Sequence, residues 1–138
     1  MGQIKVVIDT NVVISAILFG GVPGKLVGLW KSKAIVPFIS KEIMDEYVRV
    51  LAYPKFELSD QEIHFIIYKE ILPYFEVVTS DPSKPFISSD PSDDKFIQCA
   101  ISGNAAYIIS GDDHLLSLEP IVGIKIVNPL NFIAIYFL

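Results

Sequence analysis

The sequence predicts an α/β fold with a central parallel sheet of about five strands. Short apolar runs rich in β-branched residues alternate along the 138-residue chain with longer segments of helical periodicity. Strands that alternate with helices in this way pair in parallel through right-handed crossovers. The length fits one compact domain and a hydrophobic content of 51% is ample for its core, so we expect a single domain over residues 1–138.

Five segments have the composition of buried strands. The first, residues 4–8, is apolar apart from Lys5. It lacks the alternation of apolar and polar residues that is typical of a strand with one solvent-exposed face. This pattern predicts a central strand that is covered on both sides. The other four segments span residues 35–39, 75–78, 106–109 and 124–127.

Helices are predicted between these strands, bounded by capping residues and by Gly or Pro. Ser40 and Ser59 are expected to act as N-caps, and Gly20-Gly21 with Pro23 should separate the first two helices. The expected helices span residues 10–18, 24–33, 41–53, 60–72 and 93–102, followed by a short helix after residue 112 and a last one after residue 127. Residues 79–91, with three prolines, are expected to form a loop.

Composition limits where the protein works and what it binds. Cys99 is the only cysteine and is expected to pack in the core. Asp9 interrupts the only apolar N-terminal segment, and the apolar run 132–138 is far shorter than the roughly 20 residues that span a bilayer, so we expect a cytoplasmic protein with no membrane association. A net charge of −5 argues against purely electrostatic binding to nucleic acid, but it does not exclude a nuclease whose metal ion receives the phosphate.

Four carboxylates occur where a strand-helix-strand chain can gather them. Asp9 and Asp112 follow apolar runs, at the carboxyl ends of strands, where open parallel sheets bind ligands. Glu46 borders the apolar face of its predicted helix, and Asp94 lies near the start of another. Two such charges about 4 Å apart repel by roughly 4 kcal/mol near a protein surface, so a cluster needs a cation. Oxygen ligands suit Mg²⁺ or Mn²⁺, which predicts a metal-dependent phosphodiesterase.

Each carboxylate also has a structural alternative. Asp9 can serve as the N-cap of the following helix, and Glu46 can form an ion pair at the rim. Periodicity does not choose between Asp93 and Asp94, because each borders the apolar stripe of its helix. The helix dipole favours Asp93 as the capping residue, which leaves Asp94 as the candidate ligand. The sequence likewise does not choose between Asp112 and Asp113 as the candidate ligand.

The histidine and aromatic side chains discussed next are expected to lie at the surface or in the core, without a catalytic role. His114 lies beside two acids and is expected to be a surface group. Trp30 and the phenylalanines are expected to pack inside, because no interleaving of basic and aromatic residues suggests base stacking.

Taken together, four motifs in order resemble the PIN-domain family over nearly the whole chain. They are Val6 to Val12 (VVIDTNV), Ser40 to Leu51, Asp90 to Asp94 (DPSDD), and Ile109 to Asp112 (ISGD). The stretch Leu51 to Phe56 is similar to the PIN subgroup regarded as toxin components of toxin-antitoxin systems.

This resemblance implies a three-layer α/β/α domain and a Mg²⁺- or Mn²⁺-dependent ribonuclease site. The family's acidic positions match Asp9, Glu46, Asp94 and Asp112, which would hold the metal, and its supporting polar positions match Asn11 and Ser110. RNA is then the substrate, and an antitoxin protein is the partner if the chain is a toxin. The apolar C-terminus predicts a homo-oligomer or an antitoxin contact. The alternative is a PIN scaffold that acts mainly as a protein-binding or regulatory module with little nuclease activity.

Overall fold

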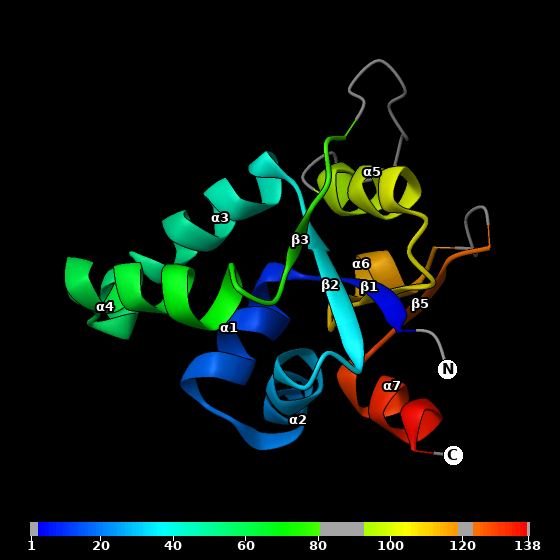
Figure 1. The fold of residues 1–138 in the computed structure, drawn as a ribbon, viewed down its shortest axis with the longest axis horizontal. Coiled ribbons are helices and arrows are strands. Elements are labelled where there is room, and N and C mark those ends of the chain that lie inside the picture. The colour runs from blue at the N-terminus through cyan, green and yellow to red at the C-terminus, as the bar shows by residue number, and fades with distance from the viewer. Residues whose placement is uncertain (1–2, 81–92, 119–122, 138) are drawn as a thin grey trace.

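A five-stranded parallel sheet forms the centre of the molecule (Figure 1). The structure, a computed structural model, describes residues 3–80, 93–118 and 123–137. The strands are β1 (Ile4–Ile8), β2 (Ile35–Ile39), β3 (Glu76–Val77), β4 (Tyr107–Ile109) and β5 (Lys125–Val127), in the order β3-β2-β1-β4-β5. The predicted α/β class with five parallel strands is confirmed, and β1 is the central strand as expected.

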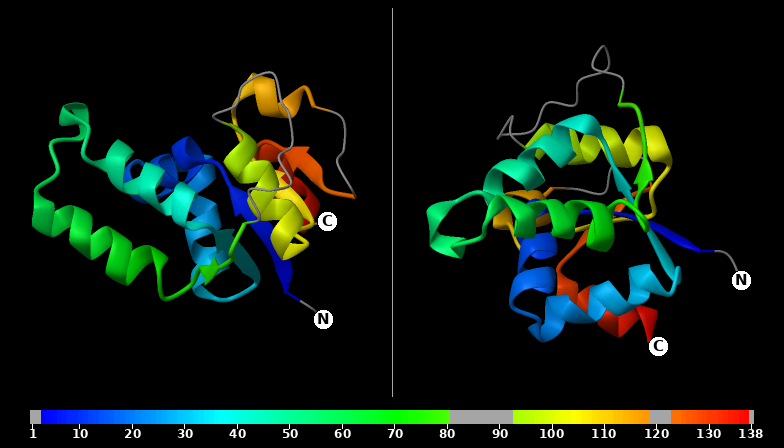
Figure 2. Two further views of the ribbon diagram at one scale, coloured as in Figure 1. Left: turned by 90° about the horizontal axis from the view of Figure 1, so that it is seen from above. Right: turned by 60° about the vertical axis from the view of Figure 1, so that its left-hand side comes forward.

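Helices cover both faces of the sheet. Figure 2 shows α1, α2 and α7 on one face and α3 and α5 on the other, which gives the three layers that the sequence implied. The helices of the described residues are α1 (Thr10–Leu18), α2 (Gly21–Lys31), α3 (Lys41–Leu51), α4 (Asp60–Phe65), α5 (Asp94–Gly103), α6 (Asp113–Leu116) and α7 (Pro129–Tyr136), with a 3-10 turn η1 (Pro54–Phe56) and a π-helical segment η2 (Ile66–Ile71).

Both predicted serine caps are present. Ser40 Oγ accepts a hydrogen bond from the Ile43 N–H at 3.3 Å, and Ser59 forms a reciprocal capping box with Glu62. The start of α2 differs from the sequence prediction by three residues. Gly20, at a φ of 73°, turns the chain, and Pro23 fits within the first helical turn, where its missing N–H costs nothing.

The segment predicted as one helix over residues 60–72 changes its winding midway. It begins as α4 and continues as the π-helical η2, in which Ile66, Ile67 and Ile71 still face the core. The strand expected at 75–78 is reduced to the two residues of β3. Of the loop expected at 79–91, residues 81 onward lie outside the described part of the chain.

The core fixes the position of the carboxyl edge of the sheet. Val6, Val7 and Ile8 are fully buried, and β1 pairs with β4 so that Ile8 lies opposite Ile109. The residues that follow these two strands therefore emerge at the same level. Gly103 lets α5 pack closely, since a Cβ atom there would lie 2.3 Å from the ring of Phe38 on β2.

Cys99 packs in the core as predicted. It is fully buried, and this burial raises the pKa of its thiol to about 12, so the thiol stays protonated and unreactive at neutral pH.

Within the described residues, no single helix is long and apolar enough to cross a membrane. Only α1 and α2 together, bent by 92° at their junction, have the length and composition of a span.

Candidate functional site

The pairing of β1 with β4 brings Asp9 next to Ser110. The Ser110 hydroxyl donates a 2.7 Å hydrogen bond to Asp9 Oδ2 and accepts one of 2.9 Å from the Asp112 N–H. The Asp9 N–H in turn donates to the Ile109 carbonyl at 2.9 Å. One buried hydroxyl thus fixes the orientation of the Asp9 carboxylate and the start of the chain segment that carries Asp112.

Helix α3 places Glu46 beside the same edge. The adjacent Tyr47 is fully buried, and its hydroxyl donates a 2.8 Å hydrogen bond to the carbonyl of Ile8, the last residue of β1. Glu46 accepts a hydrogen bond from the Thr10 hydroxyl and forms ion pairs with Lys95 at 2.8 Å and Arg49 at 3.4 Å. The ion pair weighed as the alternative for Glu46 therefore exists alongside its place at the site.

A cavity of about 340 Å³ collects these side chains at the carboxyl edge. It is lined by Asp9, Thr10, Asn11, Glu46, Arg49, Val50, Tyr53, Lys55, Phe56, Asp93, Phe96 and Asp112. A second hollow of about 370 Å³ shares Asp9, Asn11 and Asp112 with it. Three of the predicted carboxylates, Asp9, Glu46 and Asp112, and the predicted supporting residue Asn11 thus line one cavity.

The two acids at the start of α5 differ in their position relative to the cavity. Asp93 is 6% exposed and lines the cavity, whereas Asp94 is half-buried in the first turn of α5 and is not among the lining residues. Asp93 occupies the N-cap position of α5, as expected, although its side chain makes no capping hydrogen bond. The helical wheel missed this difference because both acids border the same apolar stripe.

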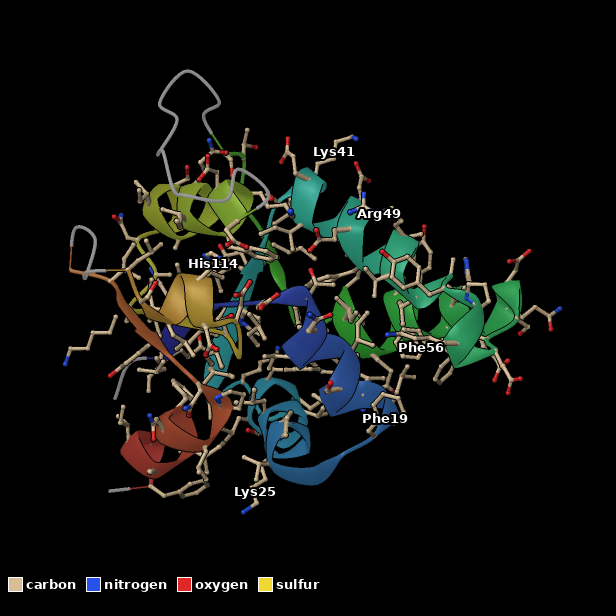
Figure 3. The ribbon with its side chains drawn as sticks, turned by 180° about the vertical axis from the view of Figure 1, so that it is seen from behind. Phe19, Lys25, Lys41, Arg49, Phe56 and His114 are labelled. Atoms are coloured by element: carbon tan, nitrogen blue, oxygen red, sulfur yellow. The ribbon has the colours of Figure 1, made fainter. Side chains whose placement is uncertain are left out.

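Asp112 combines the two roles that the sequence left open. Its Oδ1 accepts a 2.9 Å hydrogen bond from the His114 N–H and caps α6, while the side chain also lines the cavity. The His114 side chain is exposed on α6, as expected of a surface group (Figure 3).

The electrostatics of Asp9 show that the carboxylates affect one another. Burial raises the pKa of Asp9, the hydrogen bond from Ser110 opposes this rise, and the nearby charges of Asp112 and Glu46 add to it. Ionised Asp9 is therefore costly in the metal-free protein.

The carboxylates are not held in a finished metal centre. Across residues 3–80, 93–118 and 123–137, no group of three or more His, Cys, Asp or Glu side chains could hold an ion as arranged. The Glu46 carboxylate instead contacts Thr10, Lys95 and Arg49. The donor chemistry nevertheless fits Mg²⁺ or Mn²⁺, since the acids lining the cavity offer hard oxygen ligands.

Basic and aromatic side chains meet along one wall of the cavity, which the sequence reading missed. Arg49 lies near the end of α3, Tyr53 is the N-cap of η1, and Lys55 and Phe56 lie in η1; all four line the cavity. Trp30 is buried as expected, whereas residues 49–56 bring basic and aromatic side chains to the cavity. The signal was present in the sequence, but it spans the end of a helix and a turn, where helical periodicity gives no guidance.

The fold agrees with the comparisons to known proteins. A family model described as PIN domain matches residues 5–114, and the chain belongs to the PIN-domain family. It is 37% identical over 121 residues to the uncharacterized protein MJ1680 of Methanocaldococcus jannaschii, covering 85% of this chain and 76% of the relative.

Two solved structures share the fold at 14% sequence identity each. One is PAE2754 from Pyrobaculum aerophilum, with a TM-score of 0.64 over 98% of this chain and 91% of that one. The other is VapBC2 from Rickettsia felis bound to a DNA fragment from their promoter, with a TM-score of 0.60 over 91% of this chain and 98% of the matched chain.

Proposed function

We propose that the protein is a Mg²⁺- or Mn²⁺-dependent ribonuclease that hydrolyses RNA phosphodiester bonds and serves as the toxin of a toxin-antitoxin pair. One observation carries this proposal: Asp9, Glu46, Asp93 and Asp112, from segments far apart in the sequence, line a single cavity at the carboxyl edge of a PIN-domain sheet. We assign Asp9, Glu46 and Asp112 as metal ligands. Asp93 is the fourth candidate on its position, and Asp94, predicted from the family motif, is the alternative.

The side chains that line the cavity have different roles in the proposed hydrolysis. A bound divalent ion would supply Lewis-acid stabilisation of the charge that develops on the phosphate and would lower the pKa of a water molecule. Ser110 orients Asp9 through its hydroxyl, and Thr10 orients Glu46. One carboxylate of the set accepts the proton of the attacking water. Asn11, at the mouth of both hollows, can donate to a phosphate oxygen or a water molecule.

This function is tested by cleavage of labelled RNA by the purified chain. We expect cleavage with Mn²⁺ or Mg²⁺ and none with chelator. A complete lack of cleavage across varied RNAs with Mn²⁺ contradicts the proposal.

That result would favour a second candidate function, a protein-binding module with little nuclease activity. An apolar groove of about 850 Å³ between α1, α2 and α4 supports this reading, with Leu18, Val27 and Phe65 among its lining. Phe19 beside it is 71% exposed. The same groove suits an antitoxin, so a partner protein is compatible with both functions.

A pair of neighbouring variants decides the fourth acidic position. We expect Asp93→Asn to lower kcat/KM for RNA at least about 100-fold, more than the loss typical of residues that only support a metal ligand. Asp94→Asn should lower it by less than about threefold, because Asp94 lies outside the lining of the cavity. The opposite ranking, with both variants folded by circular dichroism, would restore Asp94 as the ligand.

The C-terminal helix provides a test of assembly. Phe132 and Ile133 face the core, but Leu130 and Phe137 are 62% and 67% exposed. Because one short helix has two apolar faces and only one core to meet, we expect self-association through α7. Sedimentation should show a dimer or larger species that dissociates when Leu130 and Phe137 are replaced by Ser. A strict monomer at high concentration contradicts self-association.

A further inference from the structure

One wall of the acidic cavity differs in character from the rest. We call Arg49, Tyr53, Lys55 and Phe56 the basic aromatic wall, because two of its side chains are cationic and two are aromatic. Figure 3 shows Arg49 and Phe56 on the same side of the molecule, with Phe19 next to Phe56. The wall therefore adjoins both the carboxylates and an exposed aromatic surface.

The wall is accessible to a ligand. Tyr53 is 42% exposed, and the Arg49 side chain is 63% exposed and contacts Glu46 at 3.4 Å. Lys55 Nζ lies 5.1 Å from the centroid of the Phe56 ring, so a cation and an aromatic ring already contact each other there. The 3-10 turn η1 holds Lys55 and Phe56 together.

We propose that the basic aromatic wall binds single-stranded RNA beside the bond that is cleaved, an inference that rests on the proposed ribonuclease function. Tyr53, with Phe56, stacks on an unpaired base, and Arg49 and Lys55 contact the phosphates that flank it. Stacking tolerates any base, because every base has a π-face. A base inside a duplex has both faces covered, so the wall selects unpaired nucleotides and not a particular sequence.

Charge favours RNA over a protein as the occupant. The wall offers two cations for phosphates and two aromatic rings for bases, which are the two kinds of group that a nucleic acid strand presents. Four carboxylates line the remainder of the cavity, so an acidic peptide attracted by Arg49 and Lys55 would meet repulsion a few side chains away. An RNA strand lying along the wall brings only the phosphate to be cleaved near those carboxylates, and the Asp9→Asn background of the binding test removes one of their charges.

Tyr53 is the residue to test. Phe56 also packs against the core, so its removal would disturb the fold, whereas Tyr53 lies outside the core cluster. Tyr68 is a matched control, because it is 53% exposed and does not line the cavity. Lys41 is the corresponding control for Lys55, since it lies exposed at the far end of α3 (Figure 3).

The experiment measures binding without cleavage, in an Asp9→Asn background with chelator. The probes are a fluorescein-labelled single-stranded 12-nucleotide RNA and the same RNA with abasic residues at its centre. We expect Tyr53→Ala to weaken binding of the intact RNA about 5- to 100-fold, the range for loss of one stacked base, and to leave binding of the abasic RNA unchanged. Tyr53→Phe and Tyr68→Ala should bind both probes like the parent.

The proposed contacts of the cations with phosphates are tested by the salt dependence of Kd. Lys55→Ala should reduce the slope of log Kd against log salt by about 0.7, the value for one phosphate contact on a single strand, whereas Lys41→Ala should not change it. The proposal is overturned if Tyr53→Ala binds the intact RNA like the parent, or if it loses affinity equally for both probes.

A cleavage assay of the wild-type protein with Mn²⁺ distinguishes failure of the ribonuclease function from failure of RNA binding by the basic aromatic wall. If no RNA is cleaved but Tyr53→Ala still loses base-dependent binding, the ribonuclease function fails and the wall is supported. If RNA is cleaved equally well by wild type and Tyr53→Ala, and binding is also equal, the function stands and the wall fails.

Discussion

Asp9→Asn is expected to reduce RNA cleavage at least about 100-fold while leaving the fold intact, because mutation even of a supporting partner of a metal ligand costs about 10- to 100-fold. The substitution keeps the shape of the side chain, and the amide oxygen can still accept the hydrogen bond from Ser110. What it removes is the charge that would hold the cation. Initial rates with Mn²⁺ titrated to excess measure the effect.

Asp45→Asn provides the control for Asp9→Asn. Asp45 lies on α3 next to Glu46, but it is exposed and pairs with Lys41 at 2.9 Å. Its neutralisation should be silent, because an exposed ion pair of this kind contributes little to stability. Near wild-type turnover of Asp9→Asn at saturating metal would remove Asp9 from the site.

Asp112→Asn is expected to raise the melting temperature of the metal-free protein while it impairs activity. The asparagine can still accept the hydrogen bond from the His114 N–H, so the cap of α6 is retained. Relief of repulsion worth roughly 1 kcal/mol raises Tm by about 3 to 5 °C for a domain near this size. Mn²⁺ should then stabilise wild type by mass action and the variant much less.

The difference in Tm between metal-free Asp112→Asn and wild type should depend on pH, because the pKa of Asp9 is raised. The native state holds the Asp9 proton more tightly than the unfolded chain, so the contribution of Asp9 to stability is full below pH 3.8 and is lost as pH rises through the raised pKa of Asp9. Asp112→Asn removes one cause of that rise. Its advantage in Tm should therefore be full at neutral pH and shrink as pH falls through the pKa of Asp9.

Melting curves with chelator at several pH values measure this advantage. A variant that melts lower without metal, and gains as much from Mn²⁺ as wild type, would show that Asp112 is a structural cap only.

Features encoded locally were predictable from the sequence. Ser40 and Ser59 cap helices because a hydroxyl reaches an N–H two or three residues away, and the apolar strand 4–8 is central because it has no wet face. These interactions need no knowledge of distant segments.

Features that depend on packing between segments were not predictable. Asp93 and Asp94 are equivalent on a helical wheel, and only the position of α5 against the cavity separates them. The π-helical η2 was missed because its apolar residues fit an ordinary helix equally well. Arg49 on α3 and Phe56 in η1 line one cavity, which depends on the turn between the two elements and not on a single helical period.

The hydrogen bond from Tyr47 to the Ile8 carbonyl has a consequence for the rate at which the site can assemble. It holds the backbone next to Glu46 fixed relative to the strand end that precedes Asp9. Bringing the two carboxylates onto one ion therefore requires a change of side-chain rotamer and an exchange of the contacts with Thr10, Lys95 and Arg49. The Lys95 and Glu46 side chains are 18% and 16% exposed, so this exchange breaks a largely buried ion pair and is slower than the picosecond-to-nanosecond rotamer changes of exposed side chains. Under the proposed function, metal capture would require the Glu46–Lys95 ion pair to break while the Tyr47 hydrogen bond keeps α3 attached to the end of β1.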